Sequence, residues 1–454
     1  MAKKLDVKTL KDKKILVLVE SPTKAPKIKK YLEEAGYKNV AVLASKGHIS
    51  ELKDNRASYK NSGIYPNEDF KMNLALAEDK VNLVKTLKVQ ADASDYIFLM
   101  TDGDREGEAI AWSLVKFLKL KSSKCFRSIT HEITKNAVIN AIENPIDLDE
   151  NLVDAAHARQ TIDKLVGYTL SPIAKAYIGA KSVGRCQSAG LKLIVDREKE
   201  IQNFVPETFY DVYVNFEKNG TKFKAKYVGT DLNEVNHLSS LGDVNVVKFK
   251  CNDKYIIKNI TTKEKQVSPE PPFCTATFQQ EAASKLGLKV KDAMAIAQKL
   301  FENGYITYMR TDDTEFSPEF IDVLKPYVIS KYGVFTEARK AKKSDSDQCG
   351  HECLRVTNPE FTPEDYNKID QNIFNNKVYT LIWQRTIASV LPNAKYAETT
   401  YNIYNNGQKF VLVSKELIDP GYKKVYNYSD NTDEDTFVKE TFKENEVLNV
   451  LEGI

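Results

Sequence analysis

The sequence contains no run of about eighteen consecutive apolar residues, so no membrane-spanning helix is expected. Its opening residues, Met-Ala-Lys-Lys-Leu-Asp, have no apolar stretch behind the lysines, which argues against a secretory signal. The six cysteines include no Cys-x-x-Cys pair. Free, reduced thiols are typical of intracellular proteins. These absences together predict a soluble, cytoplasmic protein without a membrane partner.

The charge is nearly balanced, with 66 Lys and Arg against 63 Asp and Glu and a formal net charge of +3. A nucleic-acid surface would therefore have to be a local basic patch. Hydrophobic residues make up 42% of the sequence and charged residues 28%, as in soluble globular proteins. A chain of 454 residues exceeds the size of one hydrophobic core, so we expect about two to four domains.

The first part of the chain has the pattern of an α/β domain. Residues 14–21 are an apolar run of strand length, and 22–36 show the periodicity of a helix that ends at Gly36. A second apolar run at 96–100 is followed by an acidic turn and then by an apolar helix at 109–115. Two strand-to-helix units of this kind predict a parallel sheet.

Acidic residues follow both predicted strands. Glu20 ends the first, and Asp102, Asp104 and Glu106 follow the second at alternate positions. Carboxylates that meet at the carboxyl ends of parallel strands suit a hard cation such as Mg²⁺. A calcium loop is excluded, because its twelfth position would be Ser113 rather than Glu. A solvated acidic turn without a metal remains an alternative on spacing alone.

Two later segments have the pattern of β-hairpins. In residues 209–227, apolar and polar side chains alternate on both sides of Asn-Gly at 219–220. The same alternation flanks Asn-Gly at 406–407 in residues 401–413. A mainly helical stretch, about 277–390, lies between them. We interpret this as one β domain interrupted by a helical domain. Two unrelated β domains are the alternative.

Two further clusters are less specific by themselves. Arg159, Asp163 and Tyr168 lie in predicted linking helices at 151–203, ahead of a Gly-containing turn at 182–188 that could hold a phosphate. An ordinary turn between helices would look the same.

Residues 301–314 include Tyr308 and Arg310, two positions apart and thus on one side of an extended chain. A phenol beside a guanidinium is suited to attack phosphorus. A tyrosine that only fills a core beside Ile306 and Met309 is the alternative.

Four motifs in order become specific together. They are Val-Glu-Ser-Pro-Thr-Lys-Ala (19–25), Thr-Asp-Gly-Asp-Arg-Glu-Gly-Glu-Ala (101–109), Ser-Val-Gly-Arg-Cys-Gln-Ser (182–188) and Gly-Tyr-Ile-Thr-Tyr-Met-Arg-Thr-Asp (304–312). This set closely resembles the type IA DNA topoisomerases of the bacterial topoisomerase I kind, from about residue 13 to the end of the chain.

The resemblance implies a multidomain fold, a Toprim domain followed by a type IA core that forms an incomplete toroid. The expected parts are the Toprim α/β domain (13–150), the first part of a helical base domain (151–206), a first β-arch segment (207–267), a helical domain with the catalytic Tyr (268–375) and a second β-arch segment (376–454).

The same resemblance assigns site residues. Tyr308 is the expected nucleophile, with Arg310, Lys24 and Glu20 as catalytic partners. The expected Mg²⁺ ligands are Glu20, Asp102, Asp104 and Glu106. The expected DNA-binding residues are His48, Arg159, Gln160, Asp163, Tyr168, Ser182, Val183, Gly184, Arg185, Cys186, Gln187, His351 and Arg355.

The sequence departs from the family pattern at several of these places. Gln160 stands where an Arg is often found, Val183 and Cys186 replace Ala and Val, and Cys353 and Val356 replace Ala and Pro. A zinc site at Cys349, His351 and Cys353 is not expected, because a fourth ligand is missing. The sequence stops after the second β segment, so we expect a chain truncated at the C-terminus, without the segment that closes the base domain.

The implied activity is ATP-independent cleavage of one DNA strand through a 5′-phosphotyrosyl intermediate, strand passage and religation, which relaxes negative supercoils. The expected partners are single-stranded and negatively supercoiled DNA, and a monomer is expected. One alternative is a truncated relative that binds single-stranded DNA with little or no strand passage. Another is a different Toprim phosphotransfer enzyme, which would not need Tyr308.

Overall fold

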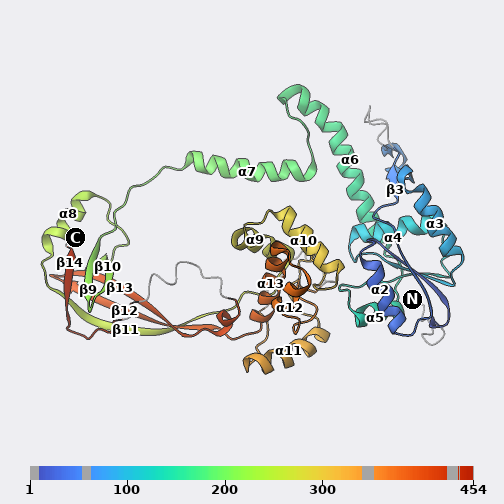
Figure 1. The fold of residues 1–454 in the computed structure, drawn as a ribbon. Helices are drawn as coiled ribbons and strands as arrows, with labels where there is room; N and C mark the ends of the chain where they lie inside the picture. The colour runs from blue at the N-terminus through green and yellow to red at the C-terminus, as the bar shows by residue number, and fades with distance from the viewer. Residues whose placement is uncertain (1–9, 54–62, 340–351, 427–437, 439, 453–454) are drawn as a thin grey trace. The chain divides into compact units, whose positions relative to one another are not determined.

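The structure is a computed structural model, and it describes residues 10–53, 63–339, 352–426, 438 and 440–452. The chain forms two compact units (Figure 1). The first contains residues 1–203, 273–320 and 343–382, and the second contains 204–272, 321–342 and 383–454. In the part of the chain that the structure describes, no helix is long and apolar enough to cross a membrane.

A four-stranded parallel sheet begins the first unit, in the order β2-β1-β7-β8. Its strands are β1 (Lys14–Val19), β2 (Asn39–Ala44), β7 (Tyr96–Met100) and β8 (Cys125–Arg127). The predicted parallel sheet and its two apolar strands are therefore confirmed. Because β1 and β7 are neighbours, the residues that follow them lie at the same edge of the sheet.

Helices cover this sheet on both faces (Figure 1). They are α2 (Lys24–Glu34), α3 (Val81–Asp92), α4 (Arg105–Phe117) and α5 (Lys135–Glu143). The helix after the acidic turn begins at Arg105, earlier than the predicted 109, because Asp104 caps it. One buried cluster joins β1 and β7 to α3 and α4, and its members include Leu16, Leu18, Val84, Leu87, Ile97, Leu99, Ile110 and Leu114.

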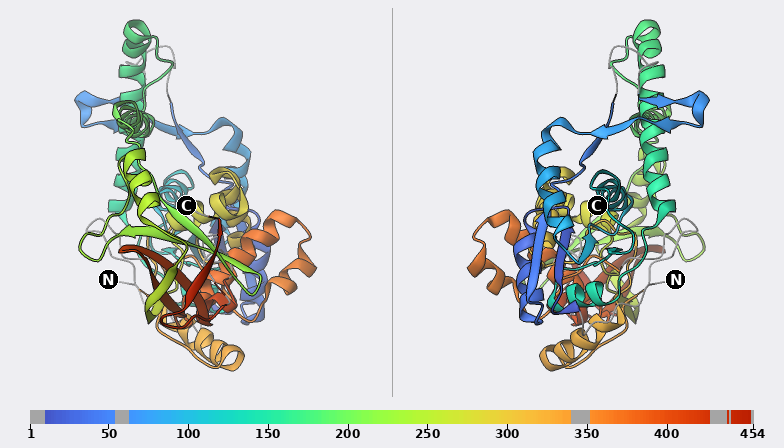
Figure 2. Two further views of the ribbon diagram at one scale, coloured as in Figure 1. Left: turned by 90° about the vertical axis from the view of Figure 1, so that its left-hand side faces the viewer. Right: turned by 90° about the vertical axis from the view of Figure 1, so that its right-hand side faces the viewer.

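Two short β pairs and a long helix extend this unit. The pairs are β3 (Ser50–Leu52) with β6 (Leu74–Leu76), and β4 (Ile64–Tyr65) with β5 (Lys71–Met72). The long helix α6 (Glu150–Ile178) begins at an Asp149 cap and ends at Gly179, whose φ is 67°. Figure 2 shows the β4–β5 pair beside α6. The turn after α6 leads to α7 (Arg185–Asn203), none of whose described side chains is buried.

The remaining part of the first unit is helical. It contains α9 (Thr275–Leu286), α10 (Val290–Glu302) and α12 (Pro363–Ile369), and the extended segment with Tyr308 follows α10. Helices α11 (Pro318–Tyr332) and α13 (Ile373–Ala388) have residues in both units. Residue 376, the expected start of the second β segment, falls inside α13, because an apolar helical stretch continues to Ala388.

The second unit is built on one closed barrel, in the order β10-β13-β12-β11-β14-β9. The strands are β9 (Tyr213–Lys218), β10 (Thr221–Gly229), β11 (Tyr255–Val267), β12 (Ala394–Asn405), β13 (Gln408–Asp419) and β14 (Val447–Glu452), and helix α8 (Leu241–Lys250) lies between β10 and β11 in the chain. The two predicted hairpins thus belong to a single β domain. Two unrelated β domains are excluded, because β10 pairs with β13 and β11 with β12.

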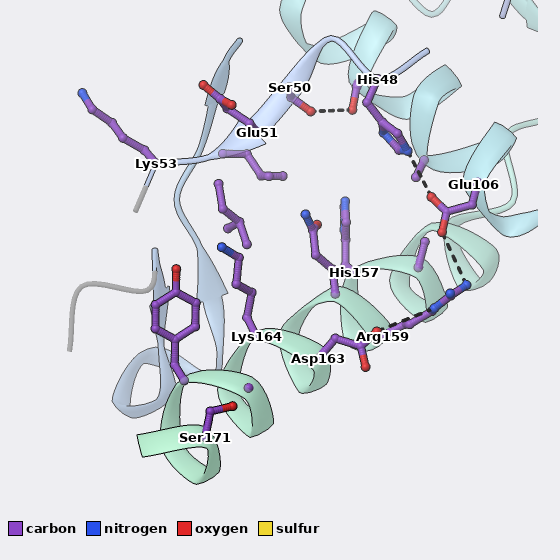
Figure 3. Close-up of a pocket in the computed structure, with 18 of the residues that line it drawn as sticks. His48, Ser50, Glu51, Lys53, Glu106, His157, Arg159, Asp163, Lys164 and Ser171 are labelled. Atoms are coloured by element: carbon purple, nitrogen blue, oxygen red, sulfur yellow. Dashed lines mark hydrogen bonds and ion pairs between the residues drawn. The ribbon is translucent and has the colours of Figure 1, made fainter. Parts of the chain in front are cut away.

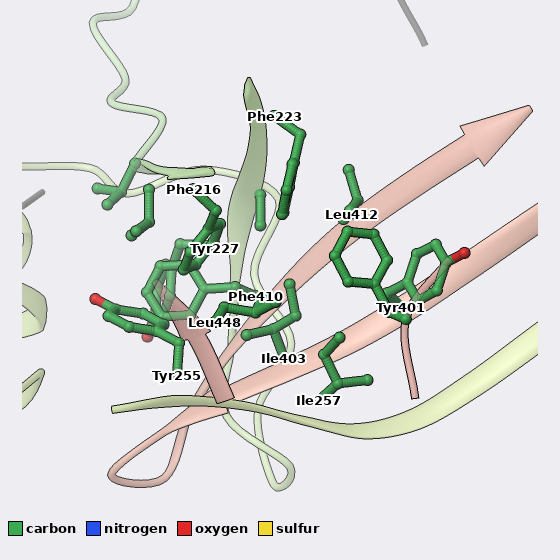
Figure 4. Packing of buried hydrophobic residues seen from close by; sticks show 14 of the residues in the cluster. Phe216, Phe223, Tyr227, Tyr255, Ile257, Tyr401, Ile403, Phe410, Leu412 and Leu448 are labelled. Atoms are coloured by element: carbon green, nitrogen blue, oxygen red, sulfur yellow. The ribbon is translucent and has the colours of Figure 1, made fainter. Parts of the chain in front are cut away.

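Aromatic rings fill the barrel (Figure 4). Phe216 packs edge-to-face on Tyr255, and Phe410 contacts both Tyr255 and Tyr227. Rings that meet in this way stabilise a core beyond the area that they bury. Both hairpin turns have left-handed Asn-Gly pairs at 219–220 and 406–407, as the sequence predicts.

Candidate active site

The acidic turn lies where β7 ends and α4 begins. Asp104 accepts a hydrogen bond of 2.8 Å from the backbone N–H of Gly107 and so caps the helix. Gly107 packs directly on the turn, since an ideal Cβ there would lie 2.2 Å from the carbonyl oxygen of Asp102. A side chain at this position would therefore force the acidic turn to move.

A buried arginine supports the turn from β8. Arg127 Nε donates to Glu108 at 2.7 Å, Nη2 donates to the carbonyl of Asp102 at 2.7 Å, and Nη1 donates to the carbonyls of Leu99 and Thr101. The other carboxylate oxygen of Glu108 accepts from the backbone of Asp149, the cap of α6. One ion pair thus links the acidic turn to the start of α6.

Glu20 faces the same edge of the sheet. Burial, and next the charge of Asp102, raise the pKa of Glu20 to about 7, although Lys24 acts in the opposite direction. Lys24 is itself buried, forms an ion pair with Asp102 and lies 4.8 Å from the ring centroid of Phe301. Glu20 is therefore able to give or take a proton near neutral pH.

Tyr308 lies against this acidic edge. Its hydroxyl donates to Oδ2 of Asp104 at 2.5 Å, and Arg310 Nη1 lies 3.4 Å from the same oxygen. The predicted pairing of Tyr308 with Arg310 on one side of the chain is thus borne out. Tyr308 is also 3% exposed and packs on Phe301, so burial in a core and contact with the acids occur together.

The electrostatics of this contact favour a protonated phenol beside an ionised carboxylate. Burial, followed by the charges of Asp104 and Asp102, raises the pKa of Tyr308 well above its usual value. Burial alone would raise the pKa of Asp104, but hydrogen bonds from Tyr308 and Gly107 and the charge of Arg310 lower it. Asp104 is therefore an ionised hydrogen-bond acceptor that holds the phenol hydroxyl in place.

The fourth acid points elsewhere. Glu106 lies 3.0 Å from His48 Nε2 and 3.5 Å from Arg159 Nη1. Among the described residues, no three His, Cys, Asp or Glu side chains already form a metal-ligand group. The donor chemistry of Glu20, Asp102 and Asp104 still suits a hard cation, because the charges of both aspartates raise the pKa of Glu20. Their joint role as ligands stays a prediction.

A cavity of about 1460 Å³ adjoins Glu106 along α6 (Figure 3). Its lining includes five residues predicted to bind DNA, namely His48, Arg159, Gln160, Asp163 and Tyr168. Lysines 53, 164, 175 and 181 also line it, and Lys164 lies 5.0 Å from the ring centroid of Tyr168. Cations and an aromatic ring along one groove are the groups that bind a single nucleic-acid strand.

The predicted phosphate-binding turn lies after this helix. Val183 N–H donates to Ser171 Oγ at 3.0 Å, and Arg185 Nε donates to Asp163 at 3.0 Å. Ser182 donates to Gln187 at 3.4 Å. Gly184 is half-buried, and Arg185, Cys186 and Gln187 are exposed. The turn is therefore tied to α6 on the side of Asp163, with its other groups open to solvent.

Two residues that were predicted to bind DNA remain, namely His351 and Arg355. His351 lies outside the described residues. Arg355 is 2% exposed, donates to both carboxylate oxygens of Glu352 and stacks 3.7 Å from the ring centroid of Phe320. Its predicted contact with DNA is untested, and in the structure its guanidinium is held by protein groups.

Sequence reasoning missed two parts of this site. The pair of Arg127 and Glu108 gave no local signal, because burial of an ion pair depends on distant strands. Lys164 could have been found, since it follows Arg159 and Gln160 by five and four positions on one helix.

The chain is similar to known proteins in both sequence and fold. A DNA topoisomerase family model matches residues 147–453, and the Toprim domain model matches residues 15–133. The solved structure of full-length topoisomerase I from Thermotoga maritima is 30% identical in sequence and has a TM-score of 0.78. The match covers 96% of this chain and 70% of that chain. The chain belongs to the type IA DNA topoisomerases.

Proposed function

We propose that this topoisomerase cleaves one DNA strand with Tyr308, passes a strand through the break and religates it, which relaxes negative supercoils without ATP. The observation that carries the proposal is the hydrogen bond from the Tyr308 hydroxyl to Asp104, within reach of Arg310. A nucleophile, a proton acceptor and a cation that stabilises phosphate charge then lie together.

In the cleavage step, the Tyr308 oxygen forms a bond to the phosphorus while the bond from phosphorus to the 3′-oxygen breaks. The phenol proton goes to Asp104, and Glu20, whose pKa is about 7, gives a proton to the leaving 3′-oxygen. Arg310 and Lys24 stabilise the phosphate charge. Religation is the reverse of these transfers, and the phosphotyrosyl bond keeps the energy of the broken link.

Glu20, Asp102 and Asp104 are the residues that would hold Mg²⁺, with Glu106 as a further ligand if it leaves His48 and Arg159. Bound there, the ion would supply positive charge for phosphate oxygens. Without it, Lys24 offsets part of the negative charge through its ion pair with Asp102.

The cavity along α6 is the proposed site for the single-stranded segment. Arg159 and Lys164 would contact phosphates, and the Tyr168 ring offers a face for base stacking. Binding of this kind tolerates many sequences.

The second candidate is a protein that binds single-stranded DNA with little or no strand passage. The observation that favours it is the exposed apolar surface of α7, where Leu191, Leu193 and Ile194 are each at least 60% exposed. Such a surface is typical of an interface.

Relaxation of negatively supercoiled plasmid without ATP, with and without Mg²⁺, tests the proposal. The native chain should relax the plasmid with Mg²⁺, and Tyr308→Phe should not, although it should bind single-stranded DNA as the native chain does. Tyr213→Phe, a change at an exposed barrel tyrosine, is the matched control. Binding without relaxation by the native chain would favour the second candidate, and relaxation by Tyr308→Phe would contradict the proposed chemistry.

A further inference from the structure

The two halves of the active site come from separate stretches of the chain. The acids follow the sheet of residues 15–133, whereas Tyr308 lies beyond α10. Contacts between these stretches occur at the reacting groups, where Tyr308 meets Asp104. Others lie outside the reacting groups, and those contacts can hold the halves together without taking part in the chemistry.

One outer contact is made by Lys27 on α2. Its ammonium donates to the carbonyl of Asn303 at 2.5 Å and lies 5.4 Å from the ring centroid of Tyr305. Asn303 caps the C-terminus of α10, the end of a helix where a cation is favoured. Lys27 therefore binds the end of the helix that leads into the tyrosine segment.

A second outer contact joins Glu132 to Arg355. Glu132 Oε2 lies 3.0 Å from Arg355 Nη2 as an ion pair, and among the described residues this buried oxygen accepts no hydrogen bond. Arg355 also donates to Glu352 through Nε and Nη2. If the halves separate, Arg355 keeps Glu352 as its partner and is not left as an unpaired buried charge, so this contact can open reversibly.

The backbone between these contacts is closely fitted. Tyr308 N–H donates to the carbonyl of His131 at 2.8 Å. Gly304 has a φ of 67°, and an ideal Cβ there would lie 2.3 Å from the carbonyl oxygen of Ile133. Lys27 and Glu132 thus stand on either side of a surface where the tyrosine segment has little freedom to shift.

We propose that Lys27 and Glu132 are positioning residues that hold the tyrosine segment against the acidic turn and so set how fast a cleaved complex religates. The proposal rests on the proposed cleavage by Tyr308. Intact DNA bridges both halves by itself. After cleavage one end is bonded to Tyr308 and the other is not, so these outer contacts then decide how long the halves stay closed.

The test follows two rates on a single-stranded oligonucleotide. One is formation of the covalent adduct, and the other is its loss after addition of Mg²⁺ and a strand with a free 3′-hydroxyl. Lys27→Met and Glu132→Gln should each slow religation by about three- to tenfold, the effect of one charged contact on a two-state equilibrium. Adduct formation should change less than about twofold, because intact DNA holds the halves together.

Controls separate positioning from general stability. Lys27→Arg should keep the native religation rate, and Lys29→Met, a change at an exposed lysine of the same helix, should have no effect. The double variant of Lys27→Met and Glu132→Gln should multiply the two slowings, since both act on one closing equilibrium. Melting temperatures of all variants show whether each is folded.

A religation rate in Lys27→Met equal to that of the native chain would overturn the proposal. Equal slowing of adduct formation and of religation would overturn it as well. If Glu132→Gln does not fold, Lys27→Met, at a half-buried position, decides alone. Absence of any adduct with the native chain would instead show that the proposed function has failed.

Discussion

The hydroxyl of Tyr308 donates a hydrogen bond of 2.5 Å to Asp104, which lies 204 positions earlier in the chain. This contact brings the tyrosine segment of one part of the sequence to the acidic turn of another. The acid is ionised and the phenol is protonated, because their pKa values are shifted in opposite directions. The hydrogen bond therefore holds the phenol in place, and its proton can pass to Asp104 only as the bond to phosphorus forms.

Gly107→Ala should disable the acidic turn. The added methyl would lie 2.2 Å from the Asp102 carbonyl oxygen and 2.9 Å from its nitrogen, so the turn must move. A shift of this size should slow adduct formation by about 100-fold. Gly190→Ala on α7 meets nothing within 4 Å and is the control. It should keep activity and raise the free energy of unfolding by about 0.5–1 kcal/mol. Native adduct rates in Gly107→Ala would contradict the role assigned to this turn.

Arg127→Met should destabilise the protein by about 3–5 kcal/mol, because it leaves Glu108 as an unpaired buried charge. A second change, Glu108→Leu, removes that charge but does not restore stability. The carbonyls of Leu99, Thr101 and Asp102 still lack the donors that Arg127 supplies. Urea unfolding of the single and double variants measures their free energies of unfolding. A double variant as stable as the native chain would show that the carbonyl contacts contribute little.

Asp370 should stabilise the fold in a pH-dependent way. Hydrogen bonds from Asn375 and from the backbone of Asn372, together with Lys299 and Tyr366, lower its pKa to about 2. Since a lowered pKa favours the ionised form, the stabilisation is present above about pH 4 and is lost as the pH falls towards 2.

Asp370→Asn should therefore reduce the free energy of unfolding by about 1–2 kcal/mol at neutral pH, and the difference from the native chain should shrink in acid. Urea unfolding at both pH values checks this. A difference of the same size at both would rule out the charge as its cause.

Arg159→Ala should weaken binding of single-stranded DNA, because Arg159 lines the cavity along α6. Loss of one phosphate contact should also reduce the slope of log affinity against log salt by about 0.7. Lys30→Ala, at a lysine whose side chain is 72% exposed on α2, is the control and should leave both quantities unchanged. A salt slope unaltered in Arg159→Ala would place the phosphate contacts elsewhere.

Local features of the fold could be predicted from the sequence. The Asn-Gly turns at 219–220 and 406–407 specify their hairpins through backbone conformation, and the apolar runs at 14–21 and 96–100 specify buried strands. The order of the strands in the barrel could not be predicted from local patterns, because β10 pairs with β13 across a long insertion.

The candidate site was only partly predictable. Spacing alone placed Tyr308 beside Arg310, and the family resemblance assigned Tyr308 and Asp104 separate roles, but the hydrogen bond between them was not predicted. The orientation of Glu106 towards His48 and Arg159 had no local cause, because those partners lie on other elements. Burial of Arg355 likewise depends on Phe320 and Glu132, which no short motif contains.

The attachment of Tyr308 to DNA is the central claim, and end-labelled oligonucleotides test it most directly. One single-stranded oligonucleotide is labelled at its 5′ end and a matched one at its 3′ end, and each reaction is stopped with denaturant. A 5′-phosphotyrosyl link predicts that the 3′ label migrates with the protein, whereas the 5′ label appears on a short free fragment. Tyr308→Phe should give neither product. An adduct that carries the 5′ label, or one that persists in Tyr308→Phe, would contradict the account.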